Sequence, residues 1–179
     1  MKILKNNLKS ELEIRTEINF PIEGIEFIDI NPIMINKNVY NEVVEKFIEE
    51  IKDKNIDYII SPEARGFLFG CPVASKLNIG FIPVRKKGKM PPTTVEKSFE
   101  YEKEYGKDIL ELPKLINNES YEDKNFYIIV DIYATGNTVR AIKQAVDSLG
   151  GNVLGTAVVI NIKELNSDDI YSLIDINEE

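Results

Sequence analysis

The sequence predicts one α/β domain, built on a mainly parallel β-sheet with helices on both of its faces. Short apolar runs of strand length alternate along the chain with amphipathic segments whose apolar residues recur every three or four positions. Such alternation is typical of βαβ units, in which each helix crosses back over the sheet. The 179 residues and the apolar fraction of 43% suit a single domain, residues 1–179, whose core needs no disulfides.

The first half of the chain contains two predicted helices and two predicted strands. A helix is expected over residues 40–54, because its apolar residues step by three and four while charged residues occupy the other face. The apolar run 57–61 then predicts a buried strand. A turn followed by a helix is expected over 63–77, and a further strand over 80–84.

The same pattern returns in the second half. Residues 126–131 predict a strand that ends on an acid, and 132–138 a short loop. A helix follows from residue 138 and is closed by two glycines, the usual punctuation of a helix C-terminus. Strands are expected over 151–162 and 171–175. Parallel sheets bind ligands beyond the carboxyl ends of their strands, so we expect a site in the loops after Ile60 and Val130.

Charge and composition exclude several classes of function. Thirty acidic residues against 22 basic ones give a net charge of −8, which disfavours sequence-independent binding to nucleic acid. The chain has no histidine, which rules out Ser-His-Asp and Cys-His catalysis and His-containing zinc sites. Its single cysteine, Cys71, fits a reducing compartment, and residues 1–10 lack the apolar run of a signal peptide. We therefore expect a cytoplasmic protein without nucleic-acid or membrane partners.

The segment 130–138, with the sequence VDIYATGNT, carries the chemistry. A buried strand delivers Asp131 to its end, and a tight loop with a glycine then opens a helix. Backbone N–H groups at a helix N-terminus attract phosphate, and the carboxylate before them can accept hydrogen bonds from sugar hydroxyls. The loop therefore suits a ribose 5-phosphate. The alternative is an ordinary turn in which Asn137 or Thr138 caps the helix. No dinucleotide-binding or Walker motif occurs.

Five segments, in order, resemble the adenine phosphoribosyltransferase family of type I phosphoribosyltransferases. Residues 27–32 (FIDINP) resemble its FRDI-x-P segment, and 63–67 match its EARGF loop. Residues 85–89 (RKKGK) are similar to its RK-x-GK turn, and 101–106 (YEKEYG) to its Y-x-L-EYG segment. Residues 130–138 look like its motif for 5-phosphoribosyl diphosphate (PRPP). The resemblance implies the type I phosphoribosyltransferase fold, with a small N-terminal hood over 1–35 and a flexible lid loop over 86–106.

The resemblance also implies purine salvage: adenine and PRPP would be converted to AMP and diphosphate by a homodimer, with Mg²⁺ bound through PRPP. No dedicated metal cage is expected, although Asp131 is a candidate ligand. The ribose 5-phosphate would be held by Asp131, Ala134, Thr135, Gly136, Asn137 and Thr138.

The diphosphate would contact two basic segments. Arg65 can hold phosphate oxygens with both arms of its guanidinium, and the run 85–89 is a local positive site in an acidic protein. The bland alternatives are a surface ion pair for Arg65 and a solvated turn for the basic run. The implied diphosphate residues are Glu63, Ala64, Arg65, Arg85 and Lys89.

The resemblance also implies that Arg65 and Glu104 are the catalytic residues. Glu104 would lie near the reacting centre, positioning the base, handling its proton or stabilising positive charge, with Tyr105 beside it on the lid. The lid would exclude water from an easily hydrolysed centre. Glu104 could instead be one more surface acid in a loop rich in glutamate. The base would lie under residues 25–30, with Glu26, Phe27 and Ile28 as its contacts, although Phe27 is equally plausible as a core residue.

Three departures from the family's pattern affect these expectations. Val130 stands where the PRPP motif has its first acid, Ile28 where the family has an arginine near the base, and Asn137 where the phosphate loop has glycine. Ile28 leaves open a transferase for hypoxanthine, guanine or xanthine. Val130 leaves open a non-catalytic regulator that binds PRPP or a nucleotide.

Overall fold

The computed structural model describes residues 1–20, 23–24, 26–103 and 106–177. Within these residues, eight strands form one sheet in the order β1-β10-β9-β8-β4-β5-β7-β6, and β2 and β3 form a separate hairpin. The strands are β1 (Lys2–Asn6), β2 (Arg15–Ile18), β3 (Glu26–Asp29), β4 (Tyr58–Pro62), β5 (Gly80–Lys86), β6 (Val95–Lys103), β7 (Gly106–Pro113), β8 (Asn125–Tyr133), β9 (Asn152–Ile162) and β10 (Tyr171–Asn177). The helices are α1 (Asn31–Ile35), α2 (Lys37–Ile51), α3 (Phe67–Leu77) and α4 (Asn137–Asp147), with 3₁₀ turns at Pro92–Thr94, Ile116–Asn118 and Lys163–Leu165.

The predicted parallel sheet is confirmed at its centre. β10, β9, β8, β4 and β5 run parallel to one another, whereas β1, β7 and β6 are added antiparallel at the two edges. The crossovers β4–α3–β5 and β8–α4–β9 supply the helices that parallel pairing requires. Both faces of the central strands are therefore covered, which explains why their sequences are continuous apolar runs.

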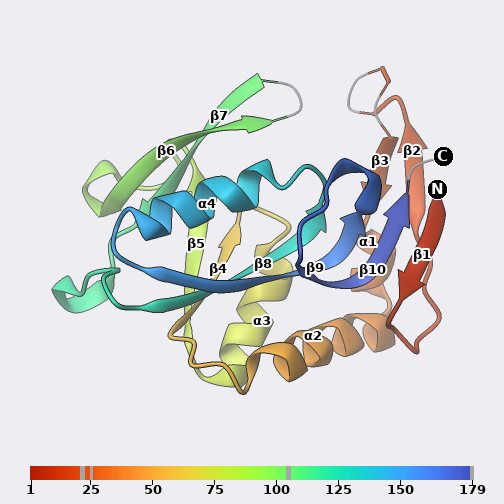
Figure 1. Ribbon diagram of the computed structural model, residues 1–179, viewed down its shortest axis with the longest axis horizontal. Helices are drawn as coiled ribbons and strands as arrows, with labels where there is room; N and C mark the ends of the chain where they lie inside the picture. Colours follow the sequence, from red (N-terminus) through yellow and green to blue (C-terminus); the bar gives the residue numbers. More distant parts are fainter. Residues whose placement is uncertain (21–22, 25, 104–105, 178–179) are drawn as a thin grey trace.

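Two hydrophobic cores lie on opposite faces of the sheet. On one face, α2 and α3 bury side chains such as Phe47 and Phe69 against the strands. On the other face, α4 buries Val139, Ile142 and Val146 together with residues of β6 and β7. Figure 1 shows α4 on one side of the sheet and α2 and α3 on the other. Among the described residues, no helix is long and apolar enough to cross a membrane.

Helix α3 contains a proline whose missing N–H is compensated from outside the helix. Pro72 cannot donate to the carbonyl of Leu68, four residues earlier. The hydroxyl of Tyr40, on α2, donates a hydrogen bond to that carbonyl instead. The two helices that cover this face are therefore joined at the point where the helical ladder is broken.

The lid region differs from the sequence prediction. Residues 86–106 were expected to form a loop without regular structure, but Val95–Lys103 is a strand that pairs with β7 from Val95↔Pro113 to Lys103↔Gly106. Its high charge masked a hairpin, because the exposed side chains of an antiparallel edge are polar. The hairpin projects from the same end of the molecule as the β2–β3 hairpin (Figure 1).

The N-terminal 35 residues do not form one hood. β1 pairs antiparallel with β10 and extends the main sheet, whereas β2 and β3 form the separate hairpin. The expected hood therefore corresponds to the part of residues 1–35 that follows β1.

The chain order places a ligand crevice between β4 and β8. From β4 the chain crosses to β5 on one side, and the later β8 is added on the other side. The helices that leave β4 and β8 lie on opposite faces of the sheet. The carboxyl ends of β4 and β8 thus form a topological switch point, where open α/β sheets bind ligands.

Candidate active site

A cavity of about 190 Å³ opens at the switch point. It is bounded by the loop after β4, the end of β8 and the start of α4, with two side chains from the β6–β7 hairpin on its far side. Its lining consists of Pro62, Glu63, Ala64, Arg65, Tyr101, Leu110, Val130, Asp131, Ile132 and Thr138. Five of the predicted site residues are thus brought to one cavity.

The loop after β4 presses its backbone close to the sheet. A Cβ atom at Gly66 would lie 2.8 Å from the carbonyl oxygen of Pro62 and 3.3 Å from that of Ile129. The peptide bond between Glu63 and Ala64 is cis. Only glycine fits at position 66, which keeps the preceding residues, including Arg65, at the cavity wall.

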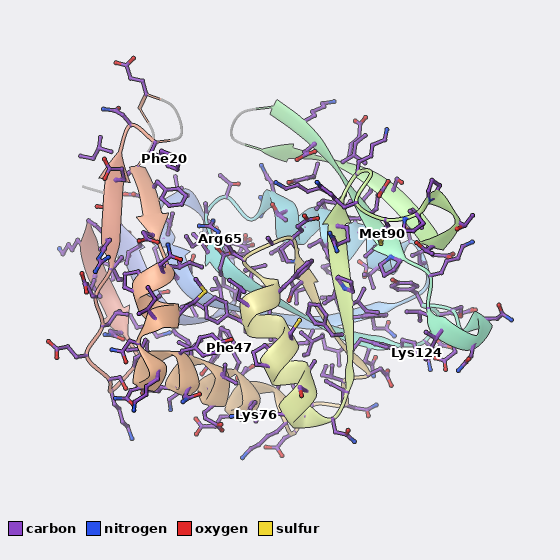
Figure 2. The ribbon with its side chains drawn as sticks, turned by 180° about the vertical axis from the view of Figure 1, so that it is seen from behind. Phe20, Phe47, Arg65, Lys76, Met90 and Lys124 are labelled. Carbon is purple, nitrogen blue, oxygen red and sulfur yellow. The ribbon has the colours of Figure 1, made fainter. Side chains whose placement is uncertain are left out.

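Arg65 lies between an acid and an aromatic ring. Its Nε atom is 2.8 Å from Oδ2 of Asp131, and its guanidinium carbon lies 5.5 Å from the centre of the Phe27 ring. The pair is close enough for an ion pair but is not aligned as a hydrogen bond. Oδ2 of Asp131 and Nη1 of Arg65 are buried without a hydrogen-bond partner among the described residues. Figure 2 shows Arg65 at the end of the sheet, near the hairpin that carries Phe20.

Burial controls the charge of Asp131. Its side chain is desolvated, which raises its pKa above the usual value, while the Arg65 charge and backbone N–H groups act in the opposite direction. A buried carboxylate beside a cation and a cavity is the arrangement found where ligands with hydroxyls or metal ions are bound.

Glu63 links the loop after β4 to the basic turn. Its Oε2 atom accepts hydrogen bonds from Nε of Arg85 at 3.0 Å and from the backbone N–H of Lys86 at 2.9 Å. Burial acts to raise the pKa of Glu63, but these two bonds and the charges of Arg85 and Lys89 together lower it. Arg85 and Lys89 are outside the cavity lining, and Arg85 is connected to it through its bond to Glu63.

The loop after β8 exposes backbone donors. Gly136 has φ +79°, a left-handed conformation that favours glycine, and it precedes α4 without any side-chain cap among the described residues. The predicted alternative, in which Asn137 or Thr138 caps the helix, is wrong. Thr138 lines the cavity, whereas the side-chain oxygen of Asn137 accepts a hydrogen bond from Nη2 of Arg140 at 2.9 Å.

The predicted base-binding residues separate onto the two faces of β3. Ile28 is only 5% exposed and belongs to the hydrophobic core. Phe27 is half-buried and faces Arg65. Its ring makes an edge contact with the ring of Phe20, with 5.1 Å between the ring centroids. Of the two apolar candidates, Phe27 is therefore the one beside the site. Glu26 is half-buried on the same strand.

Comparison with known proteins identifies the family. A family model described as a phosphoribosyl transferase domain matches residues 30–178. A protein of Clostridium acetobutylicum named adenine phosphoribosyltransferase is 46% identical over 156 residues, which cover 87% of this chain and 88% of that protein. The chain belongs to the adenine phosphoribosyltransferase family.

Solved structures of adenine phosphoribosyltransferases share the fold. The enzyme from Thermoanaerobacter pseudethanolicus is 40% identical, with a TM-score of 0.80 over 91% of this chain and 95% of that one. The enzyme from Saccharomyces cerevisiae was solved with adenine and D-2,5-dideoxy-2,5-imino-altritol 1,6-bisphosphate. It is 36% identical, with a TM-score of 0.75 over 89% of this chain and 93% of that one. The predicted family and fold are confirmed.

Two predicted residues of the adenine phosphoribosyltransferase site, Glu104 and Tyr105, lie outside the described residues. The assignment of Glu104 to catalysis and of Tyr105 to the lid remains a prediction from sequence. Val130, at the position of the missing acid, is 3% exposed and contributes an apolar surface to the cavity.

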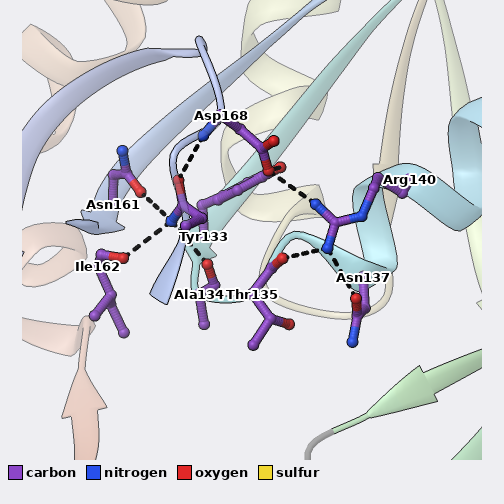
Figure 3. A network of polar contacts seen from close by, with 9 residues as sticks. Tyr133, Ala134, Thr135, Asn137, Arg140, Asn161, Ile162 and Asp168 are labelled. Atoms are coloured by element: carbon purple, nitrogen blue, oxygen red, sulfur yellow. Dashed lines mark hydrogen bonds and ion pairs between the residues drawn. The ribbon is translucent and has the colours of Figure 1, made fainter. Parts of the chain in front are cut away.

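Sequence reasoning missed four polar residues behind the loop after β8. Tyr133, Arg140, Asn166 and Asp168 form a hydrogen-bonded group around residues 134–137 (Figure 3). Arg140 lies one turn after Gly136 on α4, so its position on the helix offered a signal. Asn166 and Asp168 come from the connection after β9, and no local pattern relates them to a loop about 30 residues earlier.

Proposed function

We propose that the protein transfers the phosphoribosyl group of PRPP to N9 of adenine, giving AMP and diphosphate. The observation that carries the proposal is the position of Arg65, between Asp131 at the sheet end and Phe27 on the β2–β3 hairpin. In one crevice, the cation can bind a diphosphate, the carboxylate can bind a ribose, and the aromatic ring can stack on a planar base. The names of the related proteins support adenine as the base.

In the proposed reaction the bond between C1′ and the diphosphate oxygen breaks, and the bond between C1′ and adenine N9 forms with inversion. The electron pair of the broken bond leaves with diphosphate, whose negative charge Arg65 stabilises. The proton on N9 is transferred to the carboxylate proposed to handle it, that of Glu104. Asp131 accepts hydrogen bonds from the ribose hydroxyls, and the N–H groups around Gly136 bind the 5′-phosphate.

Phe27 is proposed to cover one face of adenine. Its ring is half-buried at the site, and its edge contact with Phe20 fixes its orientation. The backbone of β3 would supply polar contacts to the edge of the base, because the Glu26 side chain shares the face of Ile28 and lies opposite to Phe27. Ile28 supports Phe27 from the core instead of contacting the base.

Mg²⁺ is proposed to bind together with PRPP. Among the described residues no group of three metal-binding side chains exists, but Oδ2 of Asp131 is a buried carboxylate oxygen without a hydrogen-bond donor. One carboxylate together with substrate phosphates is a usual set of ligands for Mg²⁺, so the residues fit the ion. When bound, Mg²⁺ would neutralise diphosphate charge. Arg65 and Asp131 would orient the substrate around it.

The β6–β7 hairpin is proposed to act as the lid. It already supplies Tyr101 and Leu110 to the cavity wall, and Glu104 and Tyr105 come directly after β6 in the sequence, outside the described residues. Glu104 is proposed to position the base or handle its proton. We also propose a cytoplasmic homodimer, because the family resemblance implies one; sedimentation velocity of the purified chain tests the dimer.

The proposal is tested by product analysis. Purified protein is incubated with PRPP and Mg²⁺ in four tubes, each with adenine, hypoxanthine, guanine or xanthine, and nucleotides are separated by chromatography. We expect AMP and diphosphate in the adenine tube alone. A different nucleotide as the product would show that the protein uses another purine base. Because Ile28 is buried and does not contact the site, it would not prevent this. PRPP binding without any product would favour the regulator suggested by Val130.

A further inference from the structure

The carbonyl groups of the phosphate loop, residues 134–137, are held from behind by side chains. Nδ2 of Asn166 donates to the carbonyl oxygen of Ala134 at 2.8 Å, and Nη2 of Arg140 donates to the carbonyl oxygen of Thr135. In a planar trans peptide the C=O and the following N–H point in opposite directions. These two contacts therefore turn the N–H groups of Thr135 and Gly136 away from the holding side chains.

Both holding side chains are themselves fixed. Asp168 accepts a hydrogen bond from Nη1 of Arg140 at 2.8 Å and one from the hydroxyl of Tyr133 at 2.6 Å. Asn166 also donates to Oδ1 of Asn161 at 2.9 Å and to the carbonyl oxygen of Ile162 at 2.9 Å. Its own Oδ1 accepts from the N–H of Asp168 at 3.3 Å. Figure 3 shows Asp168 and Arg140 beside Ala134 and Thr135, with these contacts drawn as dashed lines.

The N–H groups thus oriented are available as donors. Among the described residues, none accepts a hydrogen bond from the N–H of Thr135 or Gly136. Gly136 is buried and Thr135 is half-buried, so neither residue is fully exposed to solvent. Successive N–H groups that point the same way form a concave site for an anion.

We propose that Arg140 and Asn166 are positioning residues for the 5′-phosphate of PRPP, with Asp168 holding Arg140 in place. This inference rests on the proposed function only for the identity of the phosphate ligand. Arg140 uses its fork to hold a carbonyl, Asn137 and Asp168 at once. Arg140 thus contributes the geometry of the loop as well as a positive charge. A lysine at this position would keep the charge but could not make the three contacts together.

The test is the binding of ribose 5-phosphate, measured by titration calorimetry for the full chain. We expect Arg140→Gln to weaken binding roughly 10-fold or more, because misdirected N–H groups lose charge-assisted hydrogen bonds. Arg140→Lys should restore only part of the loss. The matched control is Lys143→Gln, which removes one positive charge and one ion pair, with Asp147, from the same helix.

A second variant guards against a folding defect. Asp168→Asn leaves the Arg140 side chain in place and weakens the bonds that Asp168 accepts from Arg140 and from the Tyr133 hydroxyl, so a smaller loss in the same direction is expected. In steady-state assays both variants should raise KM for PRPP while leaving KM for adenine within about twofold. Equal affinity for ribose 5-phosphate in Arg140→Gln and Lys143→Gln would overturn the inference. Because this binding needs neither base nor turnover, it remains decisive even if no AMP is formed.

Discussion

Nε of Arg65 lies 2.8 Å from Oδ2 of Asp131, yet both side chains retain buried polar atoms without a hydrogen-bond partner among the described residues. A pair whose carboxylate is buried, and whose polar atoms are close but incompletely satisfied, is poorly optimised for stability. Its geometry is better suited to a ligand that completes the missing bonds.

Asp131→Asn tests the ribose contact. We expect KM for PRPP to rise by at least about tenfold, because a charge-assisted hydrogen bond is replaced by a neutral one. The control is Asp147→Asn, which removes an exposed acid from the end of α4. An unchanged KM would remove Asp131 from the ribose site.

The same residue predicts a dependence on pH. Because burial raises the pKa of Asp131, the folded protein holds this proton at pH values where the unfolded chain has released it. The folded state therefore gains stability from Asp131 as the pH falls through the raised pKa toward the usual value of an aspartate, and loses it as the pH rises through the same range. Asp131→Asn should raise Tm at pH 7, and this gain should shrink on acidification. Affinity for PRPP in the unsubstituted protein should fall over the same acid range. A gain in Tm that is independent of pH would contradict the prediction.

The hydrogen bond that the Tyr40 hydroxyl donates to the carbonyl of Leu68 should contribute measurably to the stability of the fold. Tyr40→Phe leaves that carbonyl without a protein donor, because Pro72 has none to offer. We expect a loss of about 0.5–1.5 kcal/mol in the free energy of unfolding by urea. Tyr171→Phe is the comparison, since its hydroxyl contacts the Lys46 carbonyl at a long 3.4 Å and should contribute less. Equal losses would show that the proline plays no part.

Gly136→Ala separates backbone strain from collision. Gly136 and Gly88 have almost the same φ, +79° and +78°. A Cβ at Gly136 would meet the Tyr133 hydroxyl at 2.3 Å, whereas one at Gly88 would meet nothing within 4 Å. Gly88→Ala should lose about 1–2 kcal/mol of stability from the left-handed conformation alone. Gly136→Ala should lose more, and Tyr133→Phe in the same chain should return part of the difference. Thermal unfolding of the three variants measures this.

Glu104→Gln tests the assignment made from sequence. We expect kcat to fall by about 10²–10⁴ with a smaller change in KM, as for loss of a group that handles a proton. Glu100→Gln, on the exposed side of β6, is the control. If the turnover of Glu104→Gln equals that of the control, Glu104 has no catalytic role and is a surface acid.

The sequence was sufficient for the central strands, their crossover helices and the two loops of the site. The strands and helices follow from the local periodicity of apolar residues, and the two loops follow from the types of residue that they contain. The hairpin was missed because Val95–Lys103 alternates charged and apolar residues too irregularly to separate from a loop. The edge strand β1 was missed for a similar reason, since all five of its residues are exposed.

The contacts that Asn166 and Asp168 make behind the phosphate loop could not be predicted from the sequence. Asn166 reaches Ala134 only because β8 and β9 are neighbours in the sheet, which places the end of one strand beside the connection that follows the other. Such proximity is a property of the topology. The role of Ile28 was likewise undecided until the register of β3 assigned its side chain to the core.

The two halves of the site grow out of separate cores. The loop with Arg65 leads into α3 on one face of the sheet, and the loop with Gly136 leads into α4 on the other. A ligand that contacts both loops therefore links two helical layers that lie on opposite faces of the sheet. Slower amide exchange in α3 and α4 together, on addition of PRPP, would record that mechanical coupling.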